Sequence, residues 1–278
     1  MSESKPVILR SAANPTLRHI VKMRDNRARR KANRVLVDGW RETSQAIHAD
    51  LELCGVYVPE SVANGTAIPS EENARFVIDR AVATNMMITV ADSMMDKIGF
   101  GQSSRGVVAE FVRPQATLDS LQLPKDPLIL VLDQIEKPGN VGAVFRCADA
   151  AGVDAILLSD CVDHYNPNSI RSSLGTVFQM PCASGSESEL ACYLSQHSIR
   201  GVTARVESSS SVWATDLTGP LAIILGSEAH GLGARWTEMD DVATAAVRIP
   251  MAGKVDSLNI SASAAILAFE AVRQRQTG

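Results

Sequence analysis

The sequence predicts an α/β fold arranged in two domains. Its 278 residues are enough for about two domains of ordinary size. In both halves, short apolar segments alternate with segments whose apolar residues recur at helical spacing, which is typical of strand–helix units. A hydrophobic fraction of 45% with 21% charged residues is ordinary for a globular protein, and it excludes wholesale disorder, a collagen-like repeat and a coiled-coil rod.

The first half has the pattern of a small α/β domain. A short apolar segment ends at Gly39, and Trp40, Thr43 and Ile47 then recur at helical spacing. The expected strands are 35–39, 51–58, 75–78 and 106–112. The expected helices are 40–49, 81–87 and 91–98. Residues 113–127 contain three prolines and no regular pattern, so we place a linker there.

The second half alternates in the same way. Residues 128–132 are continuously apolar, as expected for a parallel strand that is buried on both faces. The expected strands are 128–132, 155–158, 201–206, 221–225 and 247–251. The expected helices are 141–151, which ends at Gly152, and 257–274. The apolar stripe of the last helix consists of Ile260, Ala264, Leu267 and Ala271.

Positive charge is concentrated near the N-terminus. The whole chain carries a net charge of −4, but residues 10–34 hold nine basic residues and one acid, a local charge of +8. We expect residues 21–31 to form one helix with Arg27, Arg30 and Arg34 on one side. Such a block in an acidic protein favours local contact with a nucleic-acid backbone over general polyanion binding. A solvated basic helix without a partner is the alternative.

The remaining composition points to an intracellular protein without a metal. No apolar run approaches the roughly 18 residues of a membrane helix, and the polar N-terminus does not resemble a secretory signal. Five scattered cysteines favour free thiols in a reducing cytoplasm. The five histidines have no spacing typical of a metal site, so we expect no metal.

Three segments of the second half combine a strand with a loop rich in glycine, asparagine or serine. They are 133–146, 226–233 and 249–261. Ligands of open α/β sheets bind beyond the carboxyl ends of the strands, so the three loops are expected to converge. Asn140 is expected to cap the helix that follows it, and Ser257 or Asn259 to cap the last helix. Each segment alone also fits a plain capped helix, and His230 fits a solvated loop residue.

Taken together, the three segments resemble a family signature. Residues 140–146 read Asn-Val-Gly-Ala-Val-Phe-Arg, residues 226–232 read Gly-Ser-Glu-Ala-His-Gly-Leu, and residues 249–261 begin with Ile-Pro-Met and contain Ser-Leu-Asn-Ile-Ser. Residues 171–175 match a further Arg-x-Ser-x-Gly pattern. In this order, they resemble the SpoU (TrmH-like) RNA ribose 2′-O-methyltransferases of the SPOUT superfamily.

The first half resembles the L30e-like substrate-binding domain of such enzymes, with Asp38 and Ser104 where glutamate and proline are usual. The resemblance implies four regions: a basic extension (1–34), an L30e-like RNA-binding domain (35–112), a linker (113–127) and a SpoU catalytic domain with a trefoil knot (128–278). It also implies a homodimer. The alanines that would allow close helix packing there are Ala262, Ala264, Ala265, Ala268 and Ala271.

The resemblance further implies S-adenosylmethionine as cofactor and assigns site residues. The expected cofactor-binding residues are Leu225, Gly226, Ile249, Met251 and Leu258. The expected catalytic residues are Arg146, Asn140, Glu228, Ser257 and Asn259. The expected RNA-binding residues, which include members of the basic block, are Arg18, Lys22, Arg27, Arg30, Lys31 and Arg171.

A guanidinium does not readily release its proton, so we expect Arg146 to orient the ribose hydroxyl and stabilise developing negative charge rather than to act as a simple base. Glu228 is expected to pair with an arginine, and Asn140 and Asn259 to fix the loops and the ribose. Large-subunit (23S) ribosomal RNA is the expected substrate. A tRNA ribose methyltransferase and a catalytically silent RNA-binding or ribosome-assembly protein are the alternatives.

Overall fold

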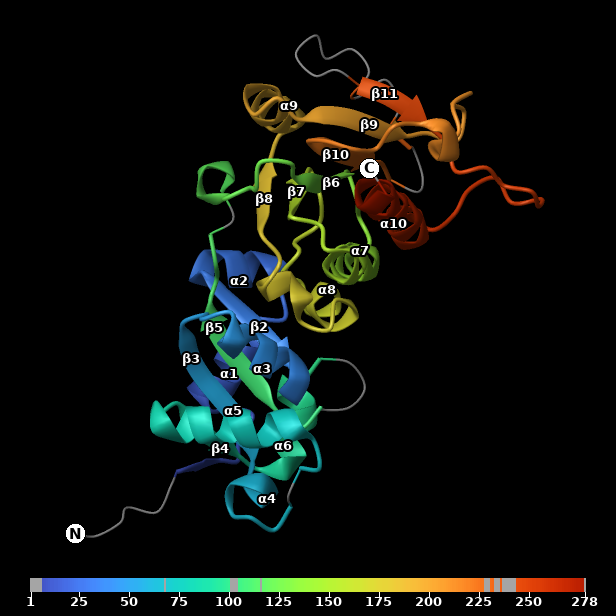
Figure 1. The fold of residues 1–278 in the computed structure, drawn as a ribbon. Coiled ribbons are helices and arrows are strands. Elements are labelled where there is room, and N and C mark those ends of the chain that lie inside the picture. Colours follow the sequence, from blue (N-terminus) through green and yellow to red (C-terminus); the bar gives the residue numbers. More distant parts are fainter. Residues whose placement is uncertain are drawn as a thin grey trace. The chain divides into compact units, whose positions relative to one another are not determined.

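The computed structural model describes most of the chain. The described ranges are 7–67, 69–100, 105–115, 117–227, 231–232, 236 and 244–277. Ser104, Glu228 and His230 lie outside them. The chain forms two compact units: unit 1 consists of Met1–Pro114 and Tyr165–Gln179, and unit 2 consists of Gln115–His164 and Met180–Gly278 (Figure 1). Unit 1 therefore includes a short segment from the second half of the sequence.

Unit 1 is built on a mixed sheet in the order β1-β4-β3-β5-β2. The strands are β1 (Ile8–Leu9), β2 (Arg34–Asp38), β3 (Leu53–Pro59), β4 (Met87–Val90) and β5 (Val108–Val112). β5 runs antiparallel to both β2 and β3, whereas β4 runs parallel to β1 and β3. The helices are α1 (Pro15–Lys22), α2 (Asn26–Ala32), α3 (Trp40–His48), α4 (Glu60–Ala63), α5 (Glu72–Ala83), α6 (Asp92–Ile98) and α8 (Pro167–Ser172).

One expected strand of the first half is wrong. Residues 75–78 lie inside α5, because Ala74, Val77 and Ala81 recur at helical spacing and are all buried. The expected helix 81–87 is wrong in its second part, since α5 ends at Ala83 and Met87 begins β4. A short β-branched run therefore looked like a strand although its longer surroundings have helical periodicity.

The basic block does not form the single helix expected at 21–31. Asp25 interrupts it: its side chain accepts a hydrogen bond from the Ala28 backbone at 2.9 Å and caps α2. Arg29 is fully buried and donates from Nη1 to the carbonyls of Met23 at 3.0 Å and Arg24 at 2.8 Å. One cation of the block thus satisfies carbonyls where α1 ends, rather than facing solvent.

Arg171 joins α8 to the rest of unit 1. Its guanidinium Nη2 donates to the Phe100 carbonyl at 2.7 Å and lies 3.4 Å from Oδ2 of Asp38. The same Asp38 oxygen accepts a hydrogen bond from the Phe100 backbone at 2.8 Å. Burial raises the pKa of the Asp38 carboxyl above its usual range, and the Phe100 N–H and the Arg171 charge oppose that rise.

Unit 2 is built on a six-stranded sheet in the order β11-β9-β10-β6-β7-β8, in which every neighbouring pair is parallel. The strands are β6 (Leu128–Asp133), β7 (Ala155–Ser159), β8 (Cys182–Gly185), β9 (Arg200–Ala204), β10 (Leu221–Leu225) and β11 (Thr244–Val247). The helices are α7 (Pro138–Ala151), α9 (Glu187–Gln196) and α10 (Ile260–Thr277). This confirms the expected α/β class, and β6, β7 and β10 are buried along their whole length.

Helix α10 packs along α7 (Figure 1). Its expected stripe is confirmed, because Ile260, Ala264, Leu267 and Ala271 are all buried. The described parts of the chain contain no helix long and apolar enough to cross a membrane.

Several boundaries of unit 2 differ from the expectation. Helix α7 begins at Pro138, so Asn140 lies in its first turn and does not cap it. The last strand is 244–247 rather than 247–251, and Pro250 lies beyond it. The last helix begins at Ile260, and Asn259 is its cap, since its Oδ1 accepts a hydrogen bond from the Ser261 backbone at 2.8 Å.

The loop after β10 returns close to its own starting point. The backbone N–H of Gly231 donates to the Ser227 carbonyl at 2.9 Å, and the two residues form an antiparallel bridge. A side chain on Gly226 would place its Cβ 2.4 Å from the carbonyl carbon of Gly231. No other residue type fits this approach without displacing the loop.

Gly226→Ala is therefore expected to lower the free energy of unfolding by about 1–3 kcal/mol, because the added methyl group forces two backbone segments apart. Thermal and urea unfolding would measure the change. Gly253→Ala is the matched control, since no heavy atom lies within 4 Å of its added Cβ. A Gly226→Ala protein as stable as the parent would contradict the close approach.

Candidate functional site

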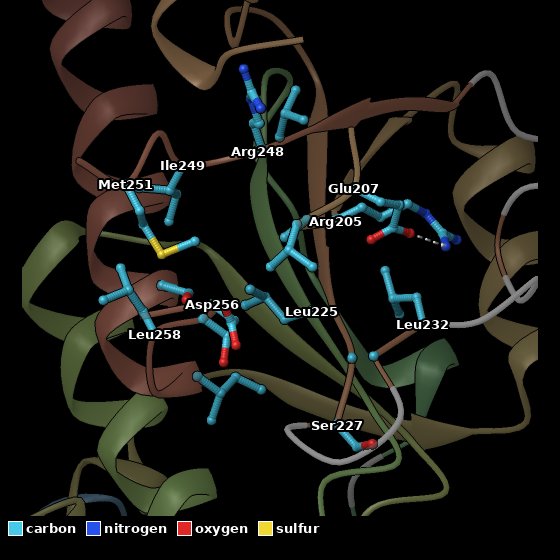
Figure 2. A pocket seen from close by; sticks show the side chains of 18 residues that line it. Arg205, Glu207, Leu225, Ser227, Leu232, Arg248, Ile249, Met251, Asp256 and Leu258 are labelled. Atoms are coloured by element: carbon cyan, nitrogen blue, oxygen red, sulfur yellow. Dashed lines mark ion pairs between the residues drawn. The ribbon is translucent and has the colours of Figure 1, made fainter. Parts of the chain in front are cut away.

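A cavity of about 460 Å³ lies where β9, β10 and β11 end and α10 begins (Figure 2). The strands are parallel neighbours, so their carboxyl ends meet at one edge of the sheet. Segments far apart in the sequence therefore contribute to one wall. The volume falls within the range of about 300–1,000 Å³ that is typical of small-molecule sites.

The five residues expected to bind a cofactor all line this cavity. They are Leu225, Gly226, Ile249, Met251 and Leu258. Figure 2 shows Ile249, Met251 and Leu258 together on one side, with Leu225 near the centre. Ser257, an expected catalytic residue, lines the same cavity. The side chains of this wall are suited to a flat apolar group, and its backbone amides and carbonyls can give that group directional hydrogen bonds.

The opposite side of the cavity is charged, which the sequence reasoning missed. Arg205 and Glu207 follow β9 and form an ion pair, with 3.6 Å between Nη1 and Oε1. Arg248 and Asp256 also line the cavity, and Figure 2 shows Asp256 beside Leu258 rather than beside the ion pair. The expected strand 201–206 included Arg205, whereas β9 ends at Ala204. Applying the rule of strand carboxyl ends to β9 as well would have indicated these residues.

Two expected catalytic residues form a hydrogen bond with each other. The Asn259 side-chain amide donates from Nδ2 to Oδ1 of Asn140 at 3.4 Å. Asn140 lies in the first turn of α7 and Asn259 directly precedes α10, so this contact brings two helix N-termini together. Arg146 lies further along α7 with its side chain exposed, and it is not among the residues that line the cavity. Glu228, the remaining catalytic candidate, lies outside the described residues.

A second cavity, of about 650 Å³, lies in unit 1 between α1 and α6. Arg18 and Lys22, both expected to contact RNA, line it together with Arg24 and Lys97. Arg24 donates to the Gly99 carbonyl, and its guanidinium carbon lies 5.8 Å from the centre of the Phe100 ring. The rest of the described lining is mainly apolar, with Leu17, Val21, Met94 and Ile98 as its apolar floor, and it includes one acid, Asp96.

The other expected RNA-binding residues lie elsewhere in unit 1. Arg27, Arg30 and Lys31 are exposed on α2, and Arg171 is engaged with Asp38 and Phe100 as described above. In the described residues, no group of three or more histidine, cysteine or acidic side chains could hold a metal ion.

Comparison with known proteins assigns both halves of the chain. Residues 127–269 match the model of the SpoU rRNA Methylase family, and residues 14–109 match that of the MRM3-like substrate binding domain. A 23S rRNA (guanosine-2′-O-)-methyltransferase RlmB from Xylella fastidiosa is 34% identical over 254 residues, which are 88% of this chain and 98% of the relative. A 23S rRNA (uridine(2479)-2′-O)-methyltransferase from Streptomyces viridochromogenes is 31% identical over 72% of this chain and 71% of its own length.

Solved structures give the same result. The crystal structure of an RNA 2′-O ribose methyltransferase is 35% identical, with a TM-score of 0.82 over 97% of this chain and 100% of that one. The structure of the SpoU methyltransferase AviRb from Streptomyces viridochromogenes in complex with the cofactor AdoMet is 27% identical, with a TM-score of 0.81 over 95% of this chain and 100% of that one. Family signature, cavity and fold therefore agree, and the chain belongs to the SpoU rRNA methylase family.

Proposed function

We propose that this protein is an S-adenosylmethionine-dependent methyltransferase that methylates a ribose 2′-hydroxyl in 23S ribosomal RNA. The observation that carries the proposal is the cavity beside the paired N-termini of α7 and α10, which is lined by Leu225, Gly226, Ile249, Met251, Ser257 and Leu258. The printed activities of the relatives support the reaction and the RNA class. The solved relative with bound AdoMet supports the cofactor.

The cavity fits the proposed cofactor. Leu225, Ile249, Met251 and Leu258 would hold the adenosine part against apolar side chains, and the polar side of the cavity remains for its charged part. The cofactor would supply a methyl group already activated by a sulfonium. The chain's own task is then to align the ribose oxygen with that methyl group and to stabilise charge as the hydroxyl proton passes to solvent water. Alignment alone can contribute several kcal/mol.

Arg146 would orient the ribose hydroxyl and stabilise the negative charge that develops on its oxygen. Its side chain is exposed on α7, and in the described part of the chain no ion pair engages it. Because an arginine keeps its proton at neutral pH, we assign it this electrostatic role rather than that of a base. Asn140 and Asn259 would fix α7 against α10, and the two adjacent helix N-termini favour the anionic RNA backbone next to the reacting sugar.

Unit 1 would bind the RNA. The cavity between α1 and α6 combines an apolar floor with Arg18, Lys22, Arg24 and Lys97 around it. Cations can contact phosphates, and an unstacked base can pack on the apolar floor or on the plane of the Arg24 guanidinium. Arg27, Arg30 and Lys31 on α2 would extend the phosphate contacts.

The active form would be a homodimer that works in the cytoplasm, where ribosomes are assembled. The alanines expected at the interface divide into two groups. Ala264, Ala268 and Ala271 are buried within the chain itself. Ala262, Ala265 and Phe269 share another face of α10, and Phe269 is 50% exposed. This second face would contact the partner copy.

Arg146→Ala is expected to lower the rate of methyl transfer by roughly 100-fold or more, since removal of one group that stabilises developing charge typically costs that much. Arg146→Lys should restore only part of the rate, because an ammonium cannot reproduce the planar donor fork. Transfer from labelled cofactor to RNA measures the rate, and calorimetry with the cofactor and with RNA should give unchanged affinities. Turnover of Arg146→Ala at the parental rate would contradict the assignment.

The same assay identifies the substrate. The parent protein is incubated with separate rRNA and tRNA pools, and mass spectrometry then locates the methylated ribose. The proposal predicts label at a 2′-oxygen of 23S rRNA. Label in tRNA alone would contradict the substrate, and cofactor binding without transfer to either pool would favour a silent RNA-binding protein.

Removing cations from the α1–α6 cavity is expected to weaken RNA binding. Arg18→Ala combined with Lys97→Ala should reduce the affinity for rRNA and lower the slope of log affinity against log salt by about 1–2, because each lost phosphate contact contributes about 0.7–0.9. Arg75→Ala is the matched control, as Arg75 carries the same charge on α5 with its side chain 92% exposed. Equal salt slopes in the parent, the double variant and Arg75→Ala would show that the RNA does not bind at the α1–α6 cavity.

A further inference from the structure

The charged side of the unit 2 cavity contains a preorganised pair. Arg205 is anchored next to β11: its backbone N–H donates to the Val247 carbonyl at 2.8 Å, and its Nε donates to Oγ1 of Thr203 at 3.3 Å. Its side chain is only 8% exposed, whereas that of Glu207 is 67% exposed. A nearly buried guanidinium thus stands beside an accessible carboxylate, 3.6 Å apart, on the wall of a ligand-sized cavity.

The pair lies apart from the apolar wall. Figure 2 shows Arg205 and Glu207 on one side of the cavity and Ile249, Met251 and Leu258 on the other. A ligand that fills the cavity would therefore have one apolar end and one end at which a positive and a negative group lie close together. The nearly buried Arg205 guanidinium favours an anionic group of the ligand, and the accessible Glu207 carboxylate can accept hydrogen bonds from a cationic one.

We propose that Arg205 and Glu207 bind the zwitterionic amino-acid end of the cofactor. The α-ammonium would donate to the Glu207 carboxylate, and the Arg205 guanidinium would donate to the α-carboxylate. This inference rests on the proposed function, since it takes the cofactor as given and orients it: the adenosine lies against Leu225, Met251 and Leu258, and the amino-acid end lies against the residues after β9.

Arg248 and Asp256 are the other charged residues of the wall among the residues that the structure describes. In Figure 2, Arg248 extends away from the Arg205–Glu207 pair. Neither residue has an ion pair within the described ranges, and both are exposed. Of the described lining residues, Arg205 and Glu207 are the two that offer both signs of charge at one place, so the zwitterion is assigned to them.

Two ligands that share the thioether nucleoside test the inference without any turnover. S-Adenosylhomocysteine has the amino-acid end, and 5′-methylthioadenosine lacks it. Calorimetry gives the affinity of the parent and of each variant for both. Glu207→Gln is expected to lower the affinity for S-adenosylhomocysteine roughly threefold to tenfold, and Arg205→Gln roughly tenfold or more, because each variant loses hydrogen bonds to a charged group. The affinity for 5′-methylthioadenosine should stay within about twofold of the parental value.

Arg248→Gln is the matched control, because it removes one guanidinium from the same wall. It should leave the ratio of the two affinities at the parental value. Thermal unfolding checks each protein, and Arg205→Lys, which keeps the charge but not the donor fork, replaces Arg205→Gln if the latter unfolds.

If Glu207→Gln and the Arg205 variant both keep the parental ratio of S-adenosylhomocysteine affinity to 5′-methylthioadenosine affinity, the inference is overturned and the proposed function stays intact. A fall of this affinity ratio in Arg248→Gln alone would also overturn the inference. A parent protein that binds neither nucleoside would overturn the proposed function itself.

Discussion

The parallel pairing of β9, β10 and β11 is the constraint on which the site depends. Parallel neighbours end at the same edge of a sheet, so the loops after residues 204, 225 and 247 meet there although long segments separate them in the chain. Close approach at Gly226 then keeps the β10 loop compact enough to form one wall. Without this arrangement, the apolar residues and the charged pair would not face one cavity.

The α7–α10 contact adds the second requirement of the chemistry. The cavity can hold a cofactor, but methyl transfer also needs a place for the sugar that receives the methyl group. The hydrogen bond between Asn259 and Asn140 ties the beginnings of both helices together, and Arg146 lies on one of them. The family signature therefore includes residues that line the cavity and two asparagines that hold the helices together.

The five residues that the sequence predicts for cofactor binding line one cavity, and their role stays a prediction. Loops 226–233 and 249–261 follow apolar strands, and the rule that ligands bind beyond strand carboxyl ends predicted that such loops converge. Both contribute residues to the cavity, whereas the described lining has no residue of the third expected loop, 133–146, which contacts Asn259 through Asn140. Arg205 and Glu207 were not predicted as site residues, because the apolar pattern of a strand does not reveal the residue at which its pairing with neighbouring strands ends. Residues 75–78 resemble a strand locally, and only Ala74, Val77 and Ala81 together reveal the helix. The burial of Arg29 depends on tertiary contacts that charge alone cannot indicate.

We infer that the segments after β9, β10 and β11 form one binding site for the methyl donor. A crystal structure of the full chain grown with S-adenosylhomocysteine is the decisive test. We expect electron density for the ligand in the cavity, with the adenosine against Leu225, Met251 and Leu258. Clear density for the ligand at another place, with this cavity empty, would show that these segments do not form the site.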